Sequence, residues 1–350
     1  MHHAARSFLR ARTQAFALAV AAVAMAVLPQ TAEAAERTRY PLTLENCGSP
    51  VTFERAPRRV VSIGQSSTEI LLSLGLADRM VGTAVWFSPV VKRFEAENAR
   101  IERLADNDPS FESVLSRTPD LVTAQFEWHV GPNGSVAKRE QFGRLGVATY
   151  LSPADCAKDN ASGGDGVRRT PFTMDLVHRE IRELAAIFDV AERGEALIAS
   201  LEKREADAVA SVRGIDAKDV SALVWFSSRE VRGDAFVAGR NGVPAYLLTA
   251  LGARNVITTD EEWPLTGWES IAAANPTVII MAEMSRRRFA ADDTAAKLRF
   301  LESDPVAGKL DAVRNRRFIL LDVEAMHPSI RAVDGIEAIA AAVERFGLMN

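Results

Sequence analysis

Short apolar runs rich in β-branched residues alternate with longer stretches of helical periodicity along most of this chain. The strands predicted for the first part of the chain lie at 59–63, 80–85, 121–124 and 147–151. After the first of them, Gly64 ends the run, and an amphipathic segment from Ser66 to Leu74 stops at Gly75. This alternation is typical of a mainly parallel sheet with helices on its faces.

The middle of the chain has a different pattern. Residues 152–171 are rich in Gly, Ser, Asp and Asn and predict a loop, whereas 173–188 and 191–212 show helical periodicity without a strand signal. A second α/β series follows, with strands predicted at 221–226, 277–281 and 317–321 and a closing helix at 333–346. The sequence therefore predicts one α/β lobe over 35–172, a helical connector over 173–212 and a second α/β lobe over 213–350.

One short pattern occurs once in each predicted lobe. The segment 111–114 (Phe-Glu-Ser-Val) precedes Pro119, and 268–271 (Trp-Glu-Ser-Ile) precedes Pro276, with seven residues from glutamate to proline in both. Each is a helix that ends before a proline, which then leads into a buried strand. The repeat indicates duplicated architecture, and the cleft between two similar lobes is a usual place for a small ligand.

The N-terminus has the pattern of a secretion signal. Three arginines make its start positive, 15–28 is an uninterrupted apolar stretch, and 32–34 (Ala-Glu-Ala) is a small-x-small cleavage site. The stretch is shorter than the roughly twenty residues that a membrane span needs, which leaves a retained anchor as the weaker alternative. We expect residues 1–34 to be a removed signal peptide and the mature protein to be free in the periplasm.

The net charge and the cysteine content further limit the class of protein to which this chain can belong. The formal net charge of −4 becomes about −6 without the three arginines and one glutamate of the signal, and such an acidic chain is a poor candidate for nucleic acid or an anionic membrane surface. In an oxidising compartment Cys47 and Cys156 predict one disulfide, with two unrelated thiols as the alternative. Neither cysteine has a neighbouring Cys or His at ligand spacing, so we expect no metal site there.

Candidate ligand contacts follow from the rule that ligands of open α/β sheets lie beyond the C-terminal ends of the strands. The ligand-binding residues that we predict are Gln65, Ser66, Ser67, Trp86, Phe87, Phe126, Glu127, Trp128, His129, Trp225, Arg240, Trp263, Arg286, Met326 and His327. Aromatic faces suit a large, partly apolar ligand, and guanidinium groups pair with catecholate or carboxylate oxygens. Trp225 is equally compatible with a place in the core, and both histidines are compatible with metal ligation or with an ordinary polar loop.

An enzyme is the main competing class. The sequence has no G-x-S-x-G elbow, phosphate loop, H-E-x-x-H or dinucleotide fingerprint. Glu127 and His129 have the chemistry of an acid–base pair, but no partnered nucleophile accompanies them. The sequence favours a binding protein over a periplasmic hydrolase, and a ligand sensor that signals to a membrane partner is a further alternative.

A set of short segments occurs in order through nearly all of the mature chain. They are 51–53, 56–62 (Ala-Pro-Arg-Arg-Val-Val-Ser), 68–71 (Thr-Glu-Ile-Leu), 74–75, 111–113 with 119–122, 251–256 (Leu-Gly-Ala-Arg-Asn-Val) and 312–315. Taken together they resemble the helical-backbone class of ABC importer solute-binding proteins, which handle iron–siderophore complexes, cobalamin and haem. The ordered set carries the resemblance, and no single segment does.

The resemblance implies two α/β lobes joined by a long rigid helix that resists large closure. It also implies that one acidic residue per lobe docks on arginines of an ABC permease, which works with an ATPase, and Glu112 and Glu269 fall at the matching positions. Their place in a first helical turn also fits simple dipole complementarity. We expect a monomer without a cofactor that binds an iron–siderophore complex, with cobalamin and then haem as alternatives.

Overall fold

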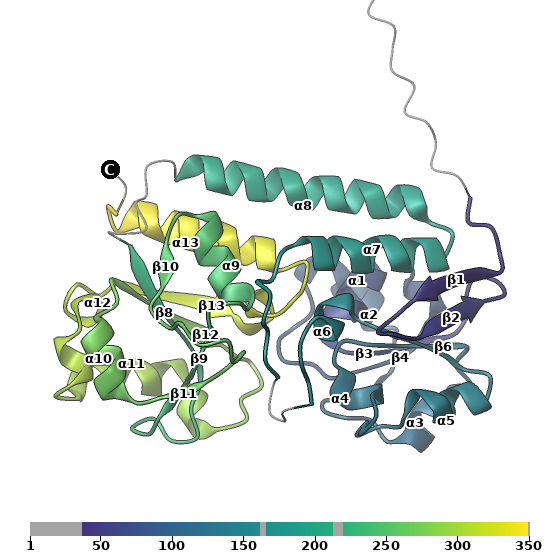
Figure 1. Cartoon of the computed structure of the whole chain (residues 1–350), viewed down its shortest axis with the longest axis horizontal. Coiled ribbons are helices and arrows are strands. Elements are labelled where there is room, and N and C mark those ends of the chain that lie inside the picture. Colours follow the sequence, from purple (N-terminus) through teal and green to yellow (C-terminus); the bar gives the residue numbers. More distant parts are fainter. Residues whose placement is uncertain (1–36, 162–165, 213–219, 349–350) are drawn as a thin grey trace, which may run out of the picture. The chain divides into compact units, whose positions relative to one another are not determined.

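The computed structural model describes residues 37–161, 166–212 and 220–348, so the predicted signal peptide lies outside the described residues. From residue 35 on, the chain forms one unit in which two α/β lobes pack against each other. Helix α8 (Ala191–Ser211) runs along one side of both lobes, and α7 (Asp175–Ile187) lies between it and the N-terminal lobe (Figure 1).

The N-terminal lobe is built on a five-stranded, all-parallel sheet with the order β5-β4-β3-β6-β7. Its strands are β3 (Val60–Ile63), β4 (Met80–Ala84), β5 (Arg103–Ala105), β6 (Leu121–Ala124) and β7 (Ala148–Leu151), and a separate antiparallel hairpin joins β1 (Leu42–Glu45) to β2 (Pro50–Phe53). Its helices are α1 (Gln65–Ser73), α2 (Glu95–Asn98), α3 (Phe111–Leu115), α4 (Glu127–Val130), α5 (Arg139–Arg144) and α6 (Pro153–Cys156), with 3-10 turns at Ala77–Arg79 and Lys92–Phe94.

The C-terminal lobe has a six-stranded mixed sheet. Its path is β11-β9-β8-β12-β13 with β10 beside β8, and β9 is antiparallel to both β8 and β11. The strands are β8 (Ser221–Ser227), β9 (Ala235–Val237), β10 (Arg254–Asn255), β11 (Leu265–Thr266), β12 (Val278–Glu283) and β13 (Phe318–Asp322). The helices are α9 (Val243–Ala250), α10 (Trp268–Ala274), α11 (Thr294–Ser303), α12 (Asp311–Arg314) and α13 (Ala332–Arg345), with 3-10 turns at Ala290–Asp292, Ala307–Lys309 and Val323–Met326.

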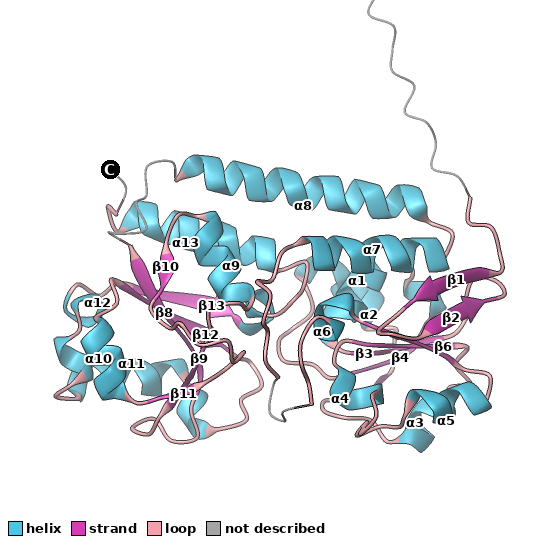
Figure 2. Ribbon diagram, in the orientation of Figure 1, coloured by secondary structure: helices cyan, strands magenta, loops and turns pink. Residues whose placement is uncertain are grey.

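The predicted α/β class with mainly parallel sheets is confirmed, and Figure 2 shows helices on both sides of the strands. The connector pattern from 173 onward forms two helices, because the chain turns at Asp189, whose φ is 56°. Strands β5, β9, β10 and β11 had no counterpart in the predicted pattern, since each has only two or three residues. The hairpin strands β1 and β2 were also missed, because they do not form a continuous buried run as β3 does.

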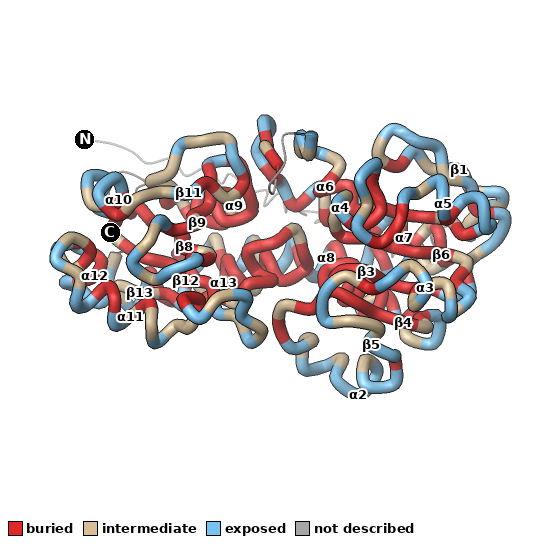
Figure 3. Tube along the Cα trace, turned by 90° about the horizontal axis from the view of Figure 1, so that it is seen from below, coloured by how far each residue is buried: buried red, intermediate tan, exposed pale blue. Residues whose placement is uncertain are grey.

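The largest apolar core continues from one lobe into the other beneath the connector. It includes Leu71 of α1, Leu184 of α7, Leu201 of α8 and Ile336 of α13. Helix α8 contacts both α7 and α13, so its buried face covers both lobes. Figure 3 shows the buried strands at the centre of each lobe and exposed chain around them. Because burial of apolar area is the main stabilising term in folding, this continuous core opposes free separation of the lobes.

Candidate functional site

The turn from β3 into α1 brings polar groups to the junction between the lobes. Gly64, with φ 128°, lies at this turn, where a Cβ would come within 2.2 Å of Gln125 Cβ. A side chain at this position is excluded by both the backbone conformation and the space. Glycine therefore lets β6 and α1 approach closely and places Gln65 and Ser66 at the junction, where both are buried.

Aromatic rings from both lobes meet around His327. The ring of His327 lies 5.4 Å from that of Phe87, 6.0 Å from that of Phe126 and 5.9 Å from that of Phe226. Phe226 stacks on Trp263 with centroids 4.4 Å apart and an interplanar angle of 26°. Phe87 and Phe126 follow strands of the first lobe, while the other three belong to the second lobe. We call these five side chains the junction cluster.

A buried carboxylate supports the histidine of this cluster. Glu324 is fully buried, with Oε1 3.4 Å from Nδ1 of His327 and Oε2 accepting a hydrogen bond from Ser66 Oγ at 3.3 Å. The hydroxyl of Ser329 donates to the Glu324 carbonyl at 2.6 Å. Ser66 belongs to the first lobe, so Glu324 contacts the opposite lobe and orients the imidazole at the same time.

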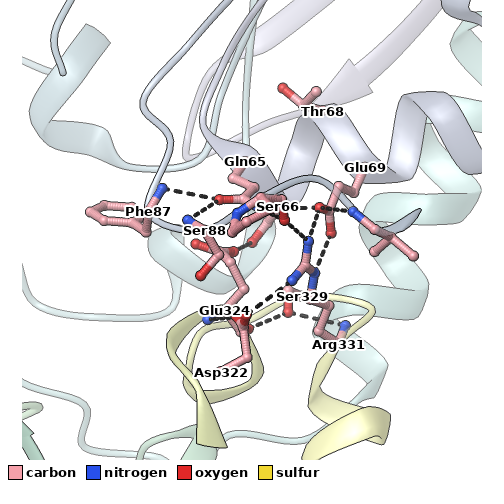
Figure 4. A network of polar contacts seen from close by, with 12 residues as sticks. Gln65, Ser66, Thr68, Glu69, Phe87, Ser88, Asp322, Glu324, Ser329 and Arg331 are labelled. Carbon is pink, nitrogen blue, oxygen red and sulfur yellow. Dashed lines mark hydrogen bonds and ion pairs between the residues drawn. The ribbon is translucent and has the colours of Figure 1, made fainter. Parts of the chain in front are cut away.

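An ion pair between Glu69 and Arg331 also crosses the junction (Figure 4). Arg331 Nε donates to Glu69 Oε2 at 2.8 Å, and Nη2 donates both to the second carboxylate oxygen and to the Pro89 carbonyl, the latter at 2.7 Å. Burial raises the pKa of Glu69, against the opposing effect of the Arg331 guanidinium. Arg331 Nη1 lies 3.3 Å from Asp322 of its own lobe, so the guanidinium has carboxylate partners on both sides. Removing one partner of such a buried pair is strongly destabilising, because it leaves the other charge unpaired.

Gln65 and Arg286 fix the chain around Phe87. The Gln65 side-chain oxygen accepts hydrogen bonds from the backbone N–H groups of Phe87 and Ser88, both at 3.0 Å. From the opposite lobe, Arg286 Nε donates to the Trp86 carbonyl at 2.8 Å. Both residues were predicted to contact the ligand, and in this structure their polar groups are used to hold the junction.

The other side of the cluster carries charged groups next to Phe126. Lys158 Nζ lies 6.0 Å from the Phe126 ring centroid and pairs with Asp155 at 2.8 Å. Asp155 also accepts a hydrogen bond from the backbone N–H of Glu127 at 2.6 Å, and Asn160 donates to the Glu127 carboxylate at 2.6 Å. This arrangement fixes the start of α4.

His129 and Trp128, also on α4, lie differently from each other. His129 is buried, and its Nε2 lies 3.3 Å from Asp108. The Asp108 pKa is lowered chiefly by this hydrogen bond. Trp128 is 63% exposed and does not belong to the junction cluster.

Five of the predicted ligand contacts point elsewhere. The ring of Trp225 packs in the core of the second lobe against Trp268 and Phe300, at 4.9 and 6.1 Å. Trp86 is buried with Arg103 over its ring at 4.7 Å. The remaining three are Met326, which is buried in the shared core, Ser67, which donates to Glu180, and Arg240, whose side chain pairs with Asp260 at the surface.

Sequence reasoning selected four of the five cluster residues and passed over several of their supports. Phe226 was among the residues after its strand but was not retained as a predicted contact, and the supporting groups Glu69, Asp155, Asp322 and Glu324 were not singled out. The available signal was position: Asp322 ends β13, and Glu324 and His327 follow it directly. The pairing of Glu69 with Arg331 spans 262 residues, and no local pattern predicts it.

The structure shows where the predicted docking residues and the predicted disulfide lie. Glu112 and Glu269 are exposed, each in the first turn of its helix, α3 and α10. In Figure 1 both helices lie on the side of their lobes away from α8. The structure contains the disulfide between Cys47 and Cys156. Within the described ranges no helix is long and apolar enough to cross a membrane, and no group of three or more His, Cys, Asp or Glu side chains could hold a metal ion.

Comparison with known proteins assigns the family. The family described as "Periplasmic binding protein" matches residues 60–325, which is most of the chain. The chain belongs to this family. The resemblance inferred from the ordered sequence segments is thereby confirmed at the level of the family, whose members are solute-binding proteins and not enzymes.

Individual relatives of this periplasmic binding protein support the same family assignment. An "Uncharacterized ABC transporter substrate-binding lipoprotein YvrC" of Bacillus subtilis is 22% identical over 308 residues, covering 87% of this chain and 86% of that protein. A periplasmic binding protein from Veillonella parvula superposes with a TM-score of 0.72 at 22% identity, covering 86% of this chain and 97% of the other. An "ABC-type Fe3+-hydroxamate transport system" structure from Saccharomonospora viridis has a TM-score of 0.69 at 26% identity, covering 88% and 100%. This periplasmic binding protein thus belongs to the substrate-binding components that work with an ABC permease and its ATPase.

Proposed function

We propose that this protein captures a ferric siderophore between its lobes in the periplasm and delivers it to an ABC permease. The observation that carries the proposal is the junction cluster, in which aromatic rings from both lobes surround one histidine. Aromatic faces supply a large apolar contact area with low conformational entropy cost, which suits a bulky chelate. The likeness to a protein of an iron(III)-hydroxamate transport system supports this ligand class.

Hydrogen-bond donors beside the cluster suit an oxygen-rich ligand. Lys158 lies 6.0 Å from the Phe126 ring centroid, Arg286 donates to the carbonyl of Trp86 directly before Phe87, and both now pair with protein oxygens. A chelate with catecholate, hydroxamate or carboxylate oxygens would compete for the same donors when it separates the lobes. The siderophore supplies all donors to its own iron, so this proposal needs no metal ligand from the protein.

A tetrapyrrole, cobalamin or haem, is the second candidate. The stacked pair of Phe226 and Trp263 presents flat faces that suit a planar ring, and His327 lies 5.9 Å from Phe226. A carboxylate behind a histidine, as Glu324 is here, is a common arrangement where the other ring nitrogen binds a metal. The two candidates differ in whether His327 contacts the bound metal.

Tryptophan fluorescence tests the proposal directly. Trp263 belongs to the cluster, so titration of the mature protein with ferrioxamine B, cyanocobalamin and haemin should give saturable quenching with ferrioxamine B at micromolar or lower concentration. Trp263→Phe should remove most of that quenching, whereas Trp268→Phe, a change in the core, should retain it. Saturable quenching by haemin or cyanocobalamin alone would move the assignment to a tetrapyrrole. A folded protein that responds to none of the three would contradict the metal-chelate proposal.

Docking to the permease is the second part of the proposal. We assign it to Glu112 and Glu269, one exposed carboxylate per lobe on the side away from α8. Charged groups at an interface rim steer association and fix its register more than they add affinity. The disposition of one glutamate on each lobe would let a symmetric pair of permease subunits contact both.

A further inference from the structure

Residues 166–172 form a stretch of extended chain that lies between the two lobes, and we call it the interlobe strap (Figure 1). On one side, Val167 pairs with Asp159 of the first lobe through hydrogen bonds of 2.9 and 3.0 Å. On the other side, Val167 bridges to Glu261, and the Arg168 N–H donates to the Asp260 carbonyl at 3.1 Å. The strap therefore adds a link between the lobes that is separate from the connector helices.

The side chain of Arg168 reaches both lobes from the strap. It is 1% exposed, with Nε donating to Glu262 Oε2 of the second lobe at 3.1 Å and Nη2 donating to the Ala154 carbonyl of the first lobe at 3.0 Å. Asn241 of the second lobe donates to the Arg168 carbonyl at 2.7 Å. A guanidinium presents its donors in a rigid planar fork, so two partners bound to it are held at a fixed separation.

One partner of Arg168 adjoins the junction cluster in sequence, and the other reaches it through a hydrogen bond. Glu262 immediately precedes Trp263, which stacks on Phe226. Ala154 immediately precedes Asp155, whose carboxylate binds the Glu127 N–H directly after Phe126. Arg168 thus joins the segment that holds the residue after Phe126 in the first lobe to the backbone that precedes Trp263 in the second lobe.

We propose that Arg168 is a positioning residue that sets the spacing between the two halves of the junction cluster. It touches none of the five cluster rings and acts through Glu262 and Ala154. The spacing is a property of the ligand-free protein, whereas its effect on ligand retention rests on the proposed function. Loss of the guanidinium removes the fork and leaves Glu262 buried without its charged partner, which favours separation of the lobes at this point.

An interlobe distance measurement tests the proposal without any ligand. Nitroxide labels on Ser116→Cys and Ser270→Cys, both at exposed positions of opposite lobes, report the spacing by pulsed electron paramagnetic resonance. We expect a narrow distance distribution in the otherwise unchanged protein and an added population at longer distance in Arg168→Met. Arg169→Met is the matched control, because its side chain is 73% exposed on the same strap and should leave the distribution unchanged.

A second variant keeps the test decisive if Arg168→Met does not fold. Glu262→Gln breaks the same pair from the other lobe and should also add the longer distance, while Arg168→Lys, a point charge without the fork, should restore the spacing only in part. If the Arg168→Met or Glu262→Gln variant is folded and melts cooperatively, and its interlobe distance distribution is nevertheless unchanged, the proposal is overturned.

Ligand kinetics separate this inference from the proposed function. With ferrioxamine B as the probe, the ligand should dissociate from the Arg168→Met variant about tenfold faster than from the control variant Arg169→Met. If the unchanged protein binds no ferrioxamine B but Arg168→Met still shows the longer distance, the proposed ligand is wrong and the positioning role stands. If ferrioxamine B binds and dissociates equally from both variants, and the distances are equal as well, the positioning role is wrong and the ligand stands.

Discussion

At the scale of single residues, Glu180 is a carboxyl group without access to solvent. It lies on α7, accepts a hydrogen bond from Ser67 Oγ at 2.7 Å and is also bound by the hydroxyl of Ser152. Burial raises the pKa of Glu180 to about 7, against the opposing effect of the two hydroxyls. The connector therefore meets α1 and the end of β7 through a group that is half protonated near neutral pH.

This environment predicts a pH dependence of stability that belongs to one residue. Because the folded-state pKa of Glu180 lies above its unfolded value of 4.5, its contribution to stability is fully present below pH 4.5 and is lost as the pH rises through about 7. The shift corresponds to about 3 kcal/mol between these limits. Glu180→Gln should flatten the fall in the free energy of unfolding between pH 4.5 and 8, measured by urea denaturation. The control variant Glu192→Gln changes an exposed carboxyl group on α8 and should show the same fall in the free energy of unfolding as the unchanged protein. Parallel curves for all three proteins would contradict the assignment.

Position at the end of a strand was the sequence signal that selected side chains at the junction, and their contact with a ligand stays a prediction. Phe87, Phe126 and His327 follow strands and meet at the junction as the strand-end rule requires. The rule cannot say which of two neighbouring side chains turns inward, and so it selected both Trp86, which is buried in the core, and Phe87. The same limit applies to Trp225 and Phe226 at the end of β8, where successive side chains point to opposite faces of the sheet.

At the scale of elements, the disulfide ties the N-terminal hairpin to the main sheet. Cys47 lies in the turn between β1 and β2, and Cys156 ends α6. Asn46, next to Cys47, donates to the Leu151 carbonyl at 2.8 Å and accepts from its N–H at 2.9 Å. Because the hairpin has only two strands, it depends on these attachments for its place.

Removing this crosslink should lower stability without changing the fold. The cysteines are 109 residues apart, and the chain-entropy estimate for such a loop is about 4–5 kcal/mol. We expect the Cys47→Ala, Cys156→Ala double variant to lose about that much free energy of unfolding in urea, with the same far-ultraviolet circular dichroism. The oxidised protein in the same buffer is the reference. A loss below about 1 kcal/mol would show that the hairpin is held by its hydrogen bonds alone.

Element prediction worked for the longer, periodic segments. Four of the five parallel strands of the first lobe and the helices of the connector follow from the apolar pattern, and the predicted segment 333–346 is α13, Ala332–Arg345. The short strands β9 and β11 carry too few residues to show a period, and their pairing depends on partners distant in sequence. The hairpin β1–β2 was missed because its strands are partly exposed and lack the continuous apolar run that marks β3.

At the scale of the whole molecule, the lobes are held together by more than the connector. The continuous apolar core, the Glu69–Arg331 pair and the Arg286 contact to the Trp86 carbonyl all cross the junction. A ligand that enters the junction cluster must therefore separate side chains that now pack on one another. We therefore expect ligand binding to need only small adjustments at the cluster, with the core and connector retained.

The proposed docking to a permease belongs to the whole molecule, because the two glutamates assigned to it lie on different lobes. Reversing both, as Glu112→Arg with Glu269→Arg, should sharply reduce stimulation of the ATPase of the cognate importer in proteoliposomes, and each single change should have a smaller effect. Ligand affinity should not change, since both residues are exposed and outside the junction cluster. Glu97→Arg, at another exposed position of the first lobe, is the charge-matched control. Equal stimulation by all of these proteins would remove Glu112 and Glu269 from the docking surface.

The central claim is that a metal chelate binds at the junction cluster, and isothermal titration calorimetry of ferrioxamine B tests it most directly. We predict one site of micromolar or tighter affinity for the mature protein. Phe226→Ala should weaken binding by about tenfold or more, because it removes a ring that contacts both Trp263 and His327. Leu320→Ala, a truncation of an exposed apolar side chain in the same lobe, should bind as the unchanged protein does. The absence of a binding isotherm, or equal affinity in the Phe226→Ala variant, would contradict the claim.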